Sequence, residues 1–166
     1  MEIKDRIQKA LRGVVKIIQH NLETGEKKFV NSNLVLDLGY QTIAYLLSHD
    51  TTYFSVSKID KISFGMGINP PAEGDTSLYW DPVYDHPGSL QVTPSYPDTY
   101  SVLFTAEWGG DKECIAPITQ LGLFTVSNIL FAETLFVDSY GSPLPMTKPL
   151  GWTWEIMWSL TYRTYS

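Results

Sequence analysis

The strongest pattern in the sequence is an alternation of apolar and polar residues near the C-terminus. From Trp152 to Tyr162 every second residue is apolar, and mostly polar residues stand between them. Successive side chains of a β-strand point to opposite faces, so this spacing predicts a strand with one face buried. We expect Trp152, Trp154, Ile156 and Trp158 to point into the core, and Thr153, Glu155 and Met157 to point outward or across an interface.

Four further segments carry the signals of strands. They cover residues 58–64, 100–108, 118–126 and 129–137. Ser127-Asn128 separates the last two segments and suits a tight hairpin turn. Gly65-Met66-Gly67 follows the first segment, and we expect a positive φ at Gly65, at Gly67 or at both.

The first third of the chain predicts a hairpin followed by a helix. Residues 14–22 and 27–30 would pair around a turn at residues 23–26. Asn31-Ser32-Asn33 offers N-cap chemistry for the helix, and Gly39 within it indicates a close approach of two backbones. The apolar stripe of the helix would cover the open face of a sheet. It consists of Leu36, Tyr40, Ile43, Ala44 and Leu47.

Residues 2–11 predict a short amphipathic helix. Ile3, Ile7 and Leu11 stand four residues apart, and a helix this short is not stable alone. We therefore expect residues 1–12 to form a helical arm that docks on a partner or a neighbouring subunit, with Gly13 ending it. The basic residues of this region are mixed with acidic ones, so we interpret them as a solvated helix face rather than a nucleic-acid site. They are Lys4, Arg6, Lys9, Arg12 and Lys16.

Residues 69–99 form a long segment rich in proline and aromatic residues. Six of the ten prolines lie in it, and proline donates no backbone hydrogen bond, so this segment is not a central strand. Long loops in compact domains are commonly functional. Its aromatic residues either anchor a protein or a sugar ring, or fold back and plug the end of the domain. They are Tyr79, Trp80, Tyr84 and Tyr96.

These elements together predict a mainly β fold. We expect an antiparallel β-sandwich-like domain over residues 13–166, with one packed α-helix and the short N-terminal helical arm. A chain of 166 residues fits one domain with a sizeable core. Hydrophobic residues make up 43% of the chain and aromatic residues 13%, which argues against a disordered chain.

Charge and hydropathy narrow the classes of function. The formal net charge of −6 disfavours binding to nucleic acid, because phosphate contacts need clustered Lys and Arg. No apolar run approaches the length of a membrane span, and residues 1–10 do not resemble a signal peptide, so we expect folding in a cytoplasm. Charged residues make up only 18% of the chain, against about 25% in average domains. This deficit indicates that part of the surface is covered by something other than water.

Metal-binding residues do not form a convincing set. Cys114 is the single cysteine, which leaves no internal disulfide and no cysteine-based metal site. Asp81, Asp85 and His86 lie close in the sequence, but their spacing matches no calcium loop. We interpret them as an exposed polar loop and expect no metal and no cofactor.

The sequence offers equally little evidence for a set of catalytic residues. Glu107, Asp111 and Glu113 flank Gly109-Gly110, and we interpret them as a solvated turn rather than as the carboxylate pair of a glycosidase. The sequence contains no nucleophile motif such as G-x-S-x-G. We therefore expect that the protein is not an enzyme.

The order of several short motifs resembles that of small virion proteins of tailed bacteriophages. Asn33 precedes a Gly-containing helix, and a strand ending in Gly-x-Gly at residues 62–67 is followed by Pro70 and by Asp-Thr-x-Leu at residues 75–78. Then come Ile-x-x-x-Gly-Leu-Phe at residues 118–124, Leu-Phe-Ala at residues 130–132, Lys148 and the Trp-rich strand. The resemblance spans residues 30–163, which is most of the chain.

This resemblance implies a β-sandwich-like virion component without catalytic residues. We expect a structural protein of the virion that decorates the head or belongs to the head, neck or tail, with other virion proteins as partners and a homo-oligomer or symmetric array as its state. We expect it to bind neither nucleic acid nor membrane. The alternative is a carbohydrate- or receptor-binding module at a phage tail tip, where the loop aromatics stack on sugar rings. The interface candidates are Ile3, Ile7, Leu11, Tyr79, Trp80, Tyr84 and Tyr96.

Overall fold

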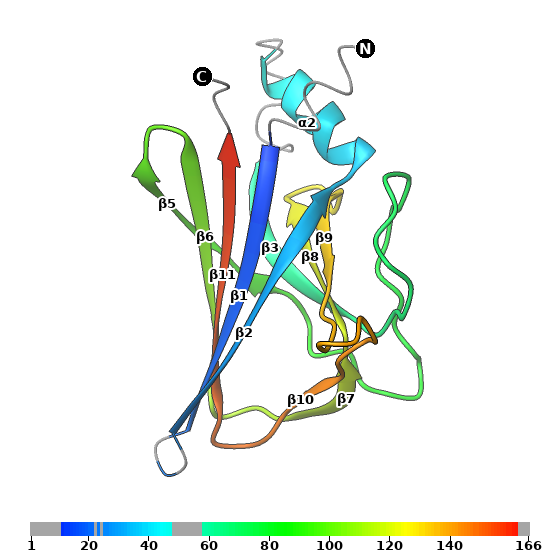
Figure 1. The fold of residues 1–166 in the computed structure, drawn as a ribbon, viewed down its shortest axis with the longest axis vertical. Coiled ribbons are helices and arrows are strands. Elements are labelled where there is room, and N and C mark those ends of the chain that lie inside the picture. Colours follow the sequence, from blue (N-terminus) through cyan, green and yellow to red (C-terminus); the bar gives the residue numbers. More distant parts are fainter. Residues whose placement is uncertain (1–10, 22, 24, 48–57, 163–166) are drawn as a thin grey trace.

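In the part of the chain that the structure describes, the protein is mainly β, as predicted, with one helix beside a nearly closed antiparallel sheet (Figure 1). The computed structural model describes residues 11–21, 23, 25–47 and 58–162. The helix is α2 (Asp37–Leu47). The strands are β1 (Leu11–Asn21), β2 (Gly25–Val35), β3 (Ile59–Gly65), β4 (Leu90–Gln91), β5 (Thr93–Asp98), β6 (Ser101–Trp108), β7 (Cys114–Ile118), β8 (Gln120–Thr125), β9 (Leu130–Leu135), β10 (Met146–Lys148) and β11 (Thr153–Tyr162).

Nine strands form one sheet that folds into two packed layers. Their order is β4-β3-β8-β9-β2-β1-β11-β6-β5, and we call β2-β1-β11-β6-β5 sheet A and β4-β3-β8-β9 sheet B. β2 joins the layers on one side, because it pairs with β1 as far as Asn33 and then with β9 at Leu34 and Val35. On the other side Val92 alone separates β4, which pairs with β3, from β5, which pairs with β6. The predicted β-sandwich-like fold is confirmed.

The core lies between the two sheets, and the alternation of β11 fills much of it. Trp154, Ile156 and Trp158 are fully buried, whereas the residues between them are half-exposed. The Trp154 ring meets the Trp108 ring edge-on, with 5.5 Å between the centroids. The expectation for Trp152 is wrong, because the chain turns at Gly151, where φ is 82°, and β11 begins only at Thr153. Trp152 is therefore half-buried at the surface.

Helix α2 packs on β9 at one end of the molecule (Figure 1). A Cβ at Gly39 would lie 2.3 Å from the carbonyl oxygen of Phe131 in β9, which confirms the predicted close approach of two backbones. The predicted N-cap is wrong. Residues 31–33 belong to β2, because pairing with β1 and then β9 holds them extended, and the helix begins only at Asp37.

Gly39→Ala should destabilise the protein, although alanine favours helices by about 1 kcal/mol over glycine. The new methyl group would press on the backbone of β9, which cannot move aside, and we expect a net loss of about 1–3 kcal/mol. Gly74→Ala is the control, because a Cβ at Gly74 meets nothing within 4 Å. Denaturant unfolding of both variants measures the difference. A Gly39→Ala protein as stable as the control would contradict this packing.

Gly65 and Gly67 do not take the expected positive φ. A Cβ at Gly67 would lie 2.2 Å from Oε1 of Gln120, and the Gly67 amide donates to the same oxygen at 2.8 Å. Nε2 of Gln120 in turn donates to Oε1 of Glu133 at 2.6 Å, and Glu133 is buried. Glycine is therefore suited to this place by the close approach of the chain to a buried polar network.

The two-stranded sheet of β7 and β10 lies at the end of the molecule opposite α2 (Figure 1). Lys148 is fully buried there, its ammonium donates to the carbonyl oxygen of Lys112, and its Nζ lies 5.3 Å from the centroid of the Trp108 ring. Burial lowers the pKa of Lys148, while Asp111 and Cys114 act in the opposite direction. Burial likewise raises the pKa of the Cys114 thiol. Both side chains therefore belong to the packing of this end.

The proline-rich segment contains two short strands that the sequence did not predict. β4 and β5 occupy residues 90–91 and 93–98, so the segment without strands ends at Ser89 rather than Thr99. Both strands stand at edges of the nine-stranded sheet. Pro94 and Pro97 are tolerated in β5 because an edge strand leaves part of its backbone unpaired.

The N-terminal arm lies mostly outside the described residues, including Ile3 and Ile7. Its last two predicted residues, Leu11 and Arg12, belong instead to β1, where they pair with Tyr162 and Thr161 of β11. Gly13 continues this strand rather than ending a helix. Leu11 is 6% exposed and joins the core, so its assignment to an interface stripe is wrong.

Candidate assembly surface

The two sheets differ in what lies on their outer faces. On sheet B, α2 packs on β9, and a Cβ at Gly122 of β8 would meet the Leu78 side chain at 3.0 Å. All of β9 is consequently buried. In sheet A, burial alternates along β11 and the first half of β1. Sheet A therefore keeps one broad open face in the described part of the chain.

We call this surface the outer face of sheet A. Its residues are exposed or half-exposed, apart from Ile18 at 7% exposed. Cross-strand register assigns to it Glu26, Lys28, Val30 and Ser32 of β2, Arg12, Val14, Lys16, Ile18 and His20 of β1, Thr153, Glu155, Met157, Ser159 and Thr161 of β11, Ser101, Leu103, Thr105 and Glu107 of β6, and Thr93 and Ser95 of β5.

Two neighbouring rows across the strands form the centre of this face. One row is Val30, Lys16, Met157, Thr105 and Thr93, and the next is Ser32, Val14, Ser159, Leu103 and Ser95. Lys16 is the single charged residue in the two rows. Val14 is 46% exposed and Val30 57%. A centre of apolar and hydroxyl side chains depleted of charge is typical of the core of a protein interface.

Charged residues border this centre at the end near the β1–β2 turn. The next row is Lys28, Ile18, Glu155 and Glu107, and the row after it is Glu26, His20 and Thr153. Nδ1 of His20 lies 3.3 Å from Oε2 of Glu26, and its Nε2 lies 3.7 Å from Oε2 of Glu155. Glu155 and Glu107 stand directly opposite each other, which destabilises a strand pair when no cation intervenes.

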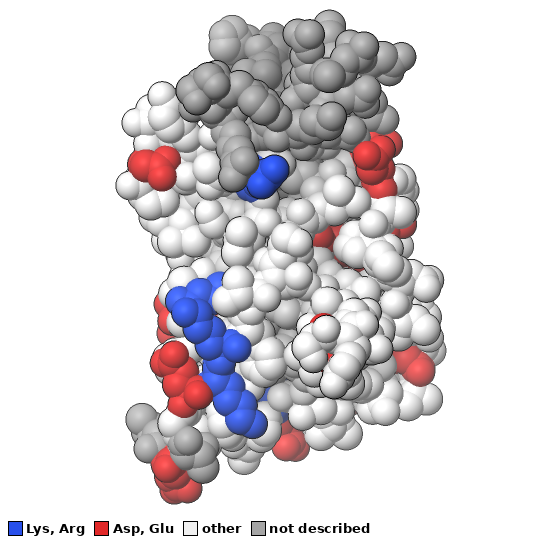
Figure 2. Space-filling model, viewed as in Figure 1, with Lys and Arg blue, Asp and Glu red and all other residues white. Residues whose placement is uncertain are grey.

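Arg12 stands at the opposite end of the face, in a row with Thr161 and Ser101. Figure 2 shows basic and acidic side chains gathered over the lower part of the molecule and a largely uncharged surface above them. The sequence pattern places Arg12 and Lys16 on a helix face. They are instead strand residues that belong to the outer face of sheet A.

The structure divides the four loop aromatics. Trp80 and Tyr84 pack against the core, and Nε1 of Trp80 donates to the Tyr84 carbonyl oxygen at 2.9 Å. Tyr79 is 58% exposed and Tyr96, on β5, is 77% exposed. The alternative in which the loop aromatics fold back onto the domain thus holds for Trp80 and Tyr84. A role in binding stays a prediction for Tyr79 and Tyr96.

The polar residues singled out in the loops take structural contacts. Oδ1 of Asp81 accepts from the Val83 amide at 3.0 Å, and Nδ1 of His86 accepts from the Gly88 amide at 3.0 Å. Within the described residues, no group of three or more His, Cys, Asp or Glu side chains comes together to hold a metal ion. Glu107 belongs to β6, whereas Asp111 and Glu113 follow it in the connection to β7.

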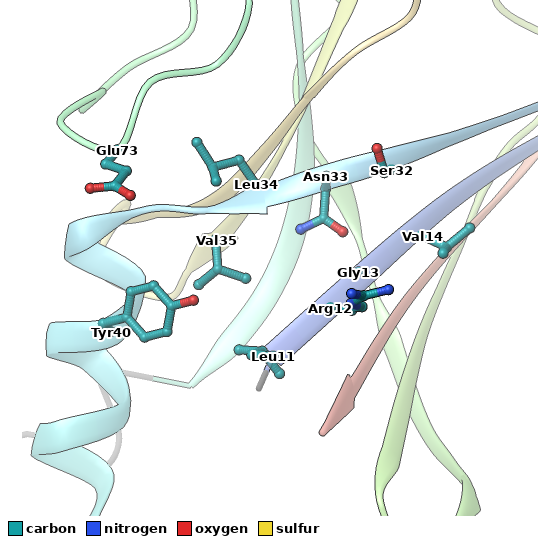
Figure 3. Close-up of a pocket in the computed structure, with 10 residues that line it drawn as sticks. All are labelled: Leu11, Arg12, Gly13, Val14, Ser32, Asn33, Leu34, Val35, Tyr40 and Glu73. Atoms are coloured by element: carbon teal, nitrogen blue, oxygen red, sulfur yellow. The ribbon is translucent and has the colours of Figure 1, made fainter. Parts of the chain in front are cut away.

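A cavity of about 310 Å³ lies where β2 leaves β1 for β9. Figure 3 shows Asn33 over Gly13, with the Tyr40 hydroxyl directed into the same space. Both amide atoms of Asn33 are buried without a hydrogen-bond partner among the described residues. Burial of the Tyr40 hydroxyl, and to a smaller extent the negative charge of Glu73, raises the pKa of Tyr40 to about 12. The cavity marks a corner where backbone pairing between the strands has ended.

Comparison with protein-family models, with curated proteins and with solved structures finds no match to the chain. In the described ranges, no helix has both the length and the apolar character that a membrane crossing requires. The surface itself therefore carries the functional argument.

Proposed function

We propose that this protein is a structural subunit of a tailed-bacteriophage particle and that it assembles by packing the outer face of sheet A on the same face of a second copy. The order of sequence motifs supports the phage assignment. The assembly rests on one observation, the charge-depleted centre of that face with Val14 46% and Val30 57% exposed. Burying such apolar side chains against a partner is favourable, and contiguous apolar patches commonly mark interaction sites.

The size of the face suits an interface. Five strands about 4.8 Å apart, with a rise of about 3.4 Å per residue from Arg12 to His20, give a surface of roughly 650 Å². Specific interfaces bury about 600–1,000 Å² on each partner. One such contact is small, but the symmetry of a particle repeats it and multiplies its effect.

The charges of the face complement those of a second copy. Consider a two-fold axis that lies in the plane of the interface, runs parallel to the rows and passes between the two central rows. This axis places the row of Arg12 on one copy opposite the row of Ile18 and Glu155 on the other copy. The same contact forms twice, because a two-fold interface is self-complementary. The Arg12 guanidinium would then approach the carboxylate of Glu155, which stands beside Glu107, while Lys28 flanks Ile18 on its other side.

Purified phage particles test the assignment to a virion. We expect mass spectrometry of particles from the phage that encodes this chain to detect it in many copies, and labelled antibody to bind at one part of the particle. Its absence from particles, together with abundance in the infected cell, would overturn the phage assignment.

Val14→Lys with Val30→Lys tests the surface within the particle. We expect loss of the protein from particles, because two ammonium groups at the centre of the interface lose their hydration. Val83→Lys is the matched control, since Val83 is 81% exposed on the proline-rich loop. Normal incorporation of the double variant would remove this face from the interface and point to another virion protein binding elsewhere.

A further inference from the structure

A second cavity, of about 260 Å³, lies on the inner side of the β1–β2 hairpin next to β10. Its walls are Phe29, Leu144, Pro145, Met146 and Pro149, and its polar groups come from Gln19, Lys27, Thr147 and the half-buried Trp152. Apolar and polar surfaces are thus mixed in one small space. It faces away from the outer face of sheet A, because Gln19 and Lys27 alternate along their strands with Ile18 and Lys28 of that face.

Gln19 is the unusual residue of this cavity. It is a polar residue that is only 6% exposed, and it lines the cavity. A carboxamide both donates and accepts hydrogen bonds, and most buried polar groups in proteins are hydrogen-bonded. Because Gln19 lines the cavity, a polar ligand there suits the wall that this side chain forms.

Two further side chains define what such a ligand must look like. The Trp152 ring forms one wall, and Nζ of Lys27 lies 5.4 Å from the centroid of that ring. Lys27 is exposed, and its flexible stem lets the ammonium turn from the ring toward a ligand. An indole face favours an apolar ring surface. The carboxamide and the ammonium favour hydroxyl or carboxylate groups at the edge of that ring.

We propose that this cavity is a binding site for a single pyranose sugar, stacked on Trp152 and hydrogen-bonded at its edge by Gln19 and Lys27. A pyranose has an apolar C–H face and a rim of hydroxyls that both donate and accept, which matches the amide of Gln19. A fatty acyl chain would offer that amide no hydrogen-bonding group. A peptide is less suited, because the cavity of about 260 Å³ is small for a chain of several residues.

Saturation-transfer NMR of the full-length protein with glucose, galactose, N-acetylglucosamine and glucuronate tests this site. We expect transfer to the C–H protons of at least one sugar, with a dissociation constant on the order of millimolar, as a ligand of this size allows. Glucuronate binding tighter than glucose would assign Lys27 to a carboxylate. No transfer to any of the four sugars would overturn the proposal.

Matched variants locate the site. Gln19→Leu should weaken binding by about tenfold or more, because it removes the hydrogen bonds of a buried amide. Lys27→Met should weaken it too, whereas the same exchange at Lys28, on the opposite face, should not. Because Lys27 is exposed, its variant remains informative if Gln19→Leu fails to fold. Unchanged binding in Lys27→Met and Trp152→Leu would contradict this site. This test is independent of assembly, since a monomer retains the cavity.

Discussion

Trp154→Ala should cost the protein about 3–5 kcal/mol of stability. Trp154 is fully buried, and its ring lies edge-on to Trp108 with 5.5 Å between the centroids. The centroids of the Phe64 and Trp108 rings lie 4.6 Å apart, so the three rings form a continuous cluster between the sheets. Alanine would leave a cavity that β11, paired on both sides by β1 and β6, cannot close.

Denaturant unfolding measures this loss, with Trp152→Ala as the control. The two residues are identical in type and two positions apart, but Trp152 is half-buried and lies before β11. We expect a clearly smaller loss in the control. Equal losses in the two variants would show that the assigned register of β11 is wrong.

The second large effect is a pH dependence that originates at Glu133. Burial of the Glu133 carboxyl, and to a smaller extent the negative charge of Asp75, raises its pKa from 4.5 to about 7. Oε1 accepts from Gln120, while Oε2 is buried without a hydrogen-bond partner among the described residues. The protonated carboxyl is therefore the form that this site favours.

The folded protein consequently binds the Glu133 proton more tightly than the unfolded chain does. Its contribution to stability is complete below pH 4.5 and is lost as the pH rises through about 7, above which it stays constant. One pKa unit corresponds to about 1.4 kcal/mol, so the change is on the order of 3 kcal/mol.

Glu133→Gln removes this titration and keeps an oxygen for the Gln120 donor. We expect wild type and variant to differ little in unfolding free energy at pH 4.5. Above pH 7 the variant should be more stable relative to wild type, by on the order of 3 kcal/mol. Comparing the two proteins at each pH cancels the titration of the other carboxylates. A constant difference across the range would show that Glu133 does not titrate there.

Local sequence patterns predicted the regular strands because period-two alternation and turn chemistry act over a few residues. The β8–β9 hairpin turns at Asn128, which takes a positive φ of 64° as tight turns often require. The alternation of residues 154–160 is followed by the structure residue by residue. The close approach at Gly39 was also predictable. Glycine is unfavourable within a helix, so its presence there indicates that a neighbouring backbone leaves no room for a side chain.

The errors come from contacts between residues far apart in the chain. Residues 31–33 carry good capping chemistry, yet pairing of Leu34 with Glu133 draws the chain from β1 to β9. Leu11 fits a helical stripe equally well, and only its pairing with Tyr162 shows it to be a strand residue. At Gly67 the deciding partner is Gln120, which lies far along the chain.

The candidate surface could not have been predicted from sequence alone. Val14, Met157 and Leu103 lie on three different strands, and only the strand order and register bring them onto one face. The deficit of charge in the composition gave the one available signal, that part of the surface is covered. The sequence pointed instead to the aromatic loop as a binding surface, although two of its four aromatic side chains pack inward.

Sedimentation velocity over a wide range of concentration tests assembly through sheet A most directly. We predict that the wild-type protein associates to a dimer, or to a larger oligomer built from dimers, as concentration rises. The Val14→Lys, Val30→Lys double variant should stay monomeric with an unchanged fold, and Val83→Lys should associate as wild type does. A wild-type protein that is monomeric throughout, or a double variant that associates as strongly as wild type, would contradict the account.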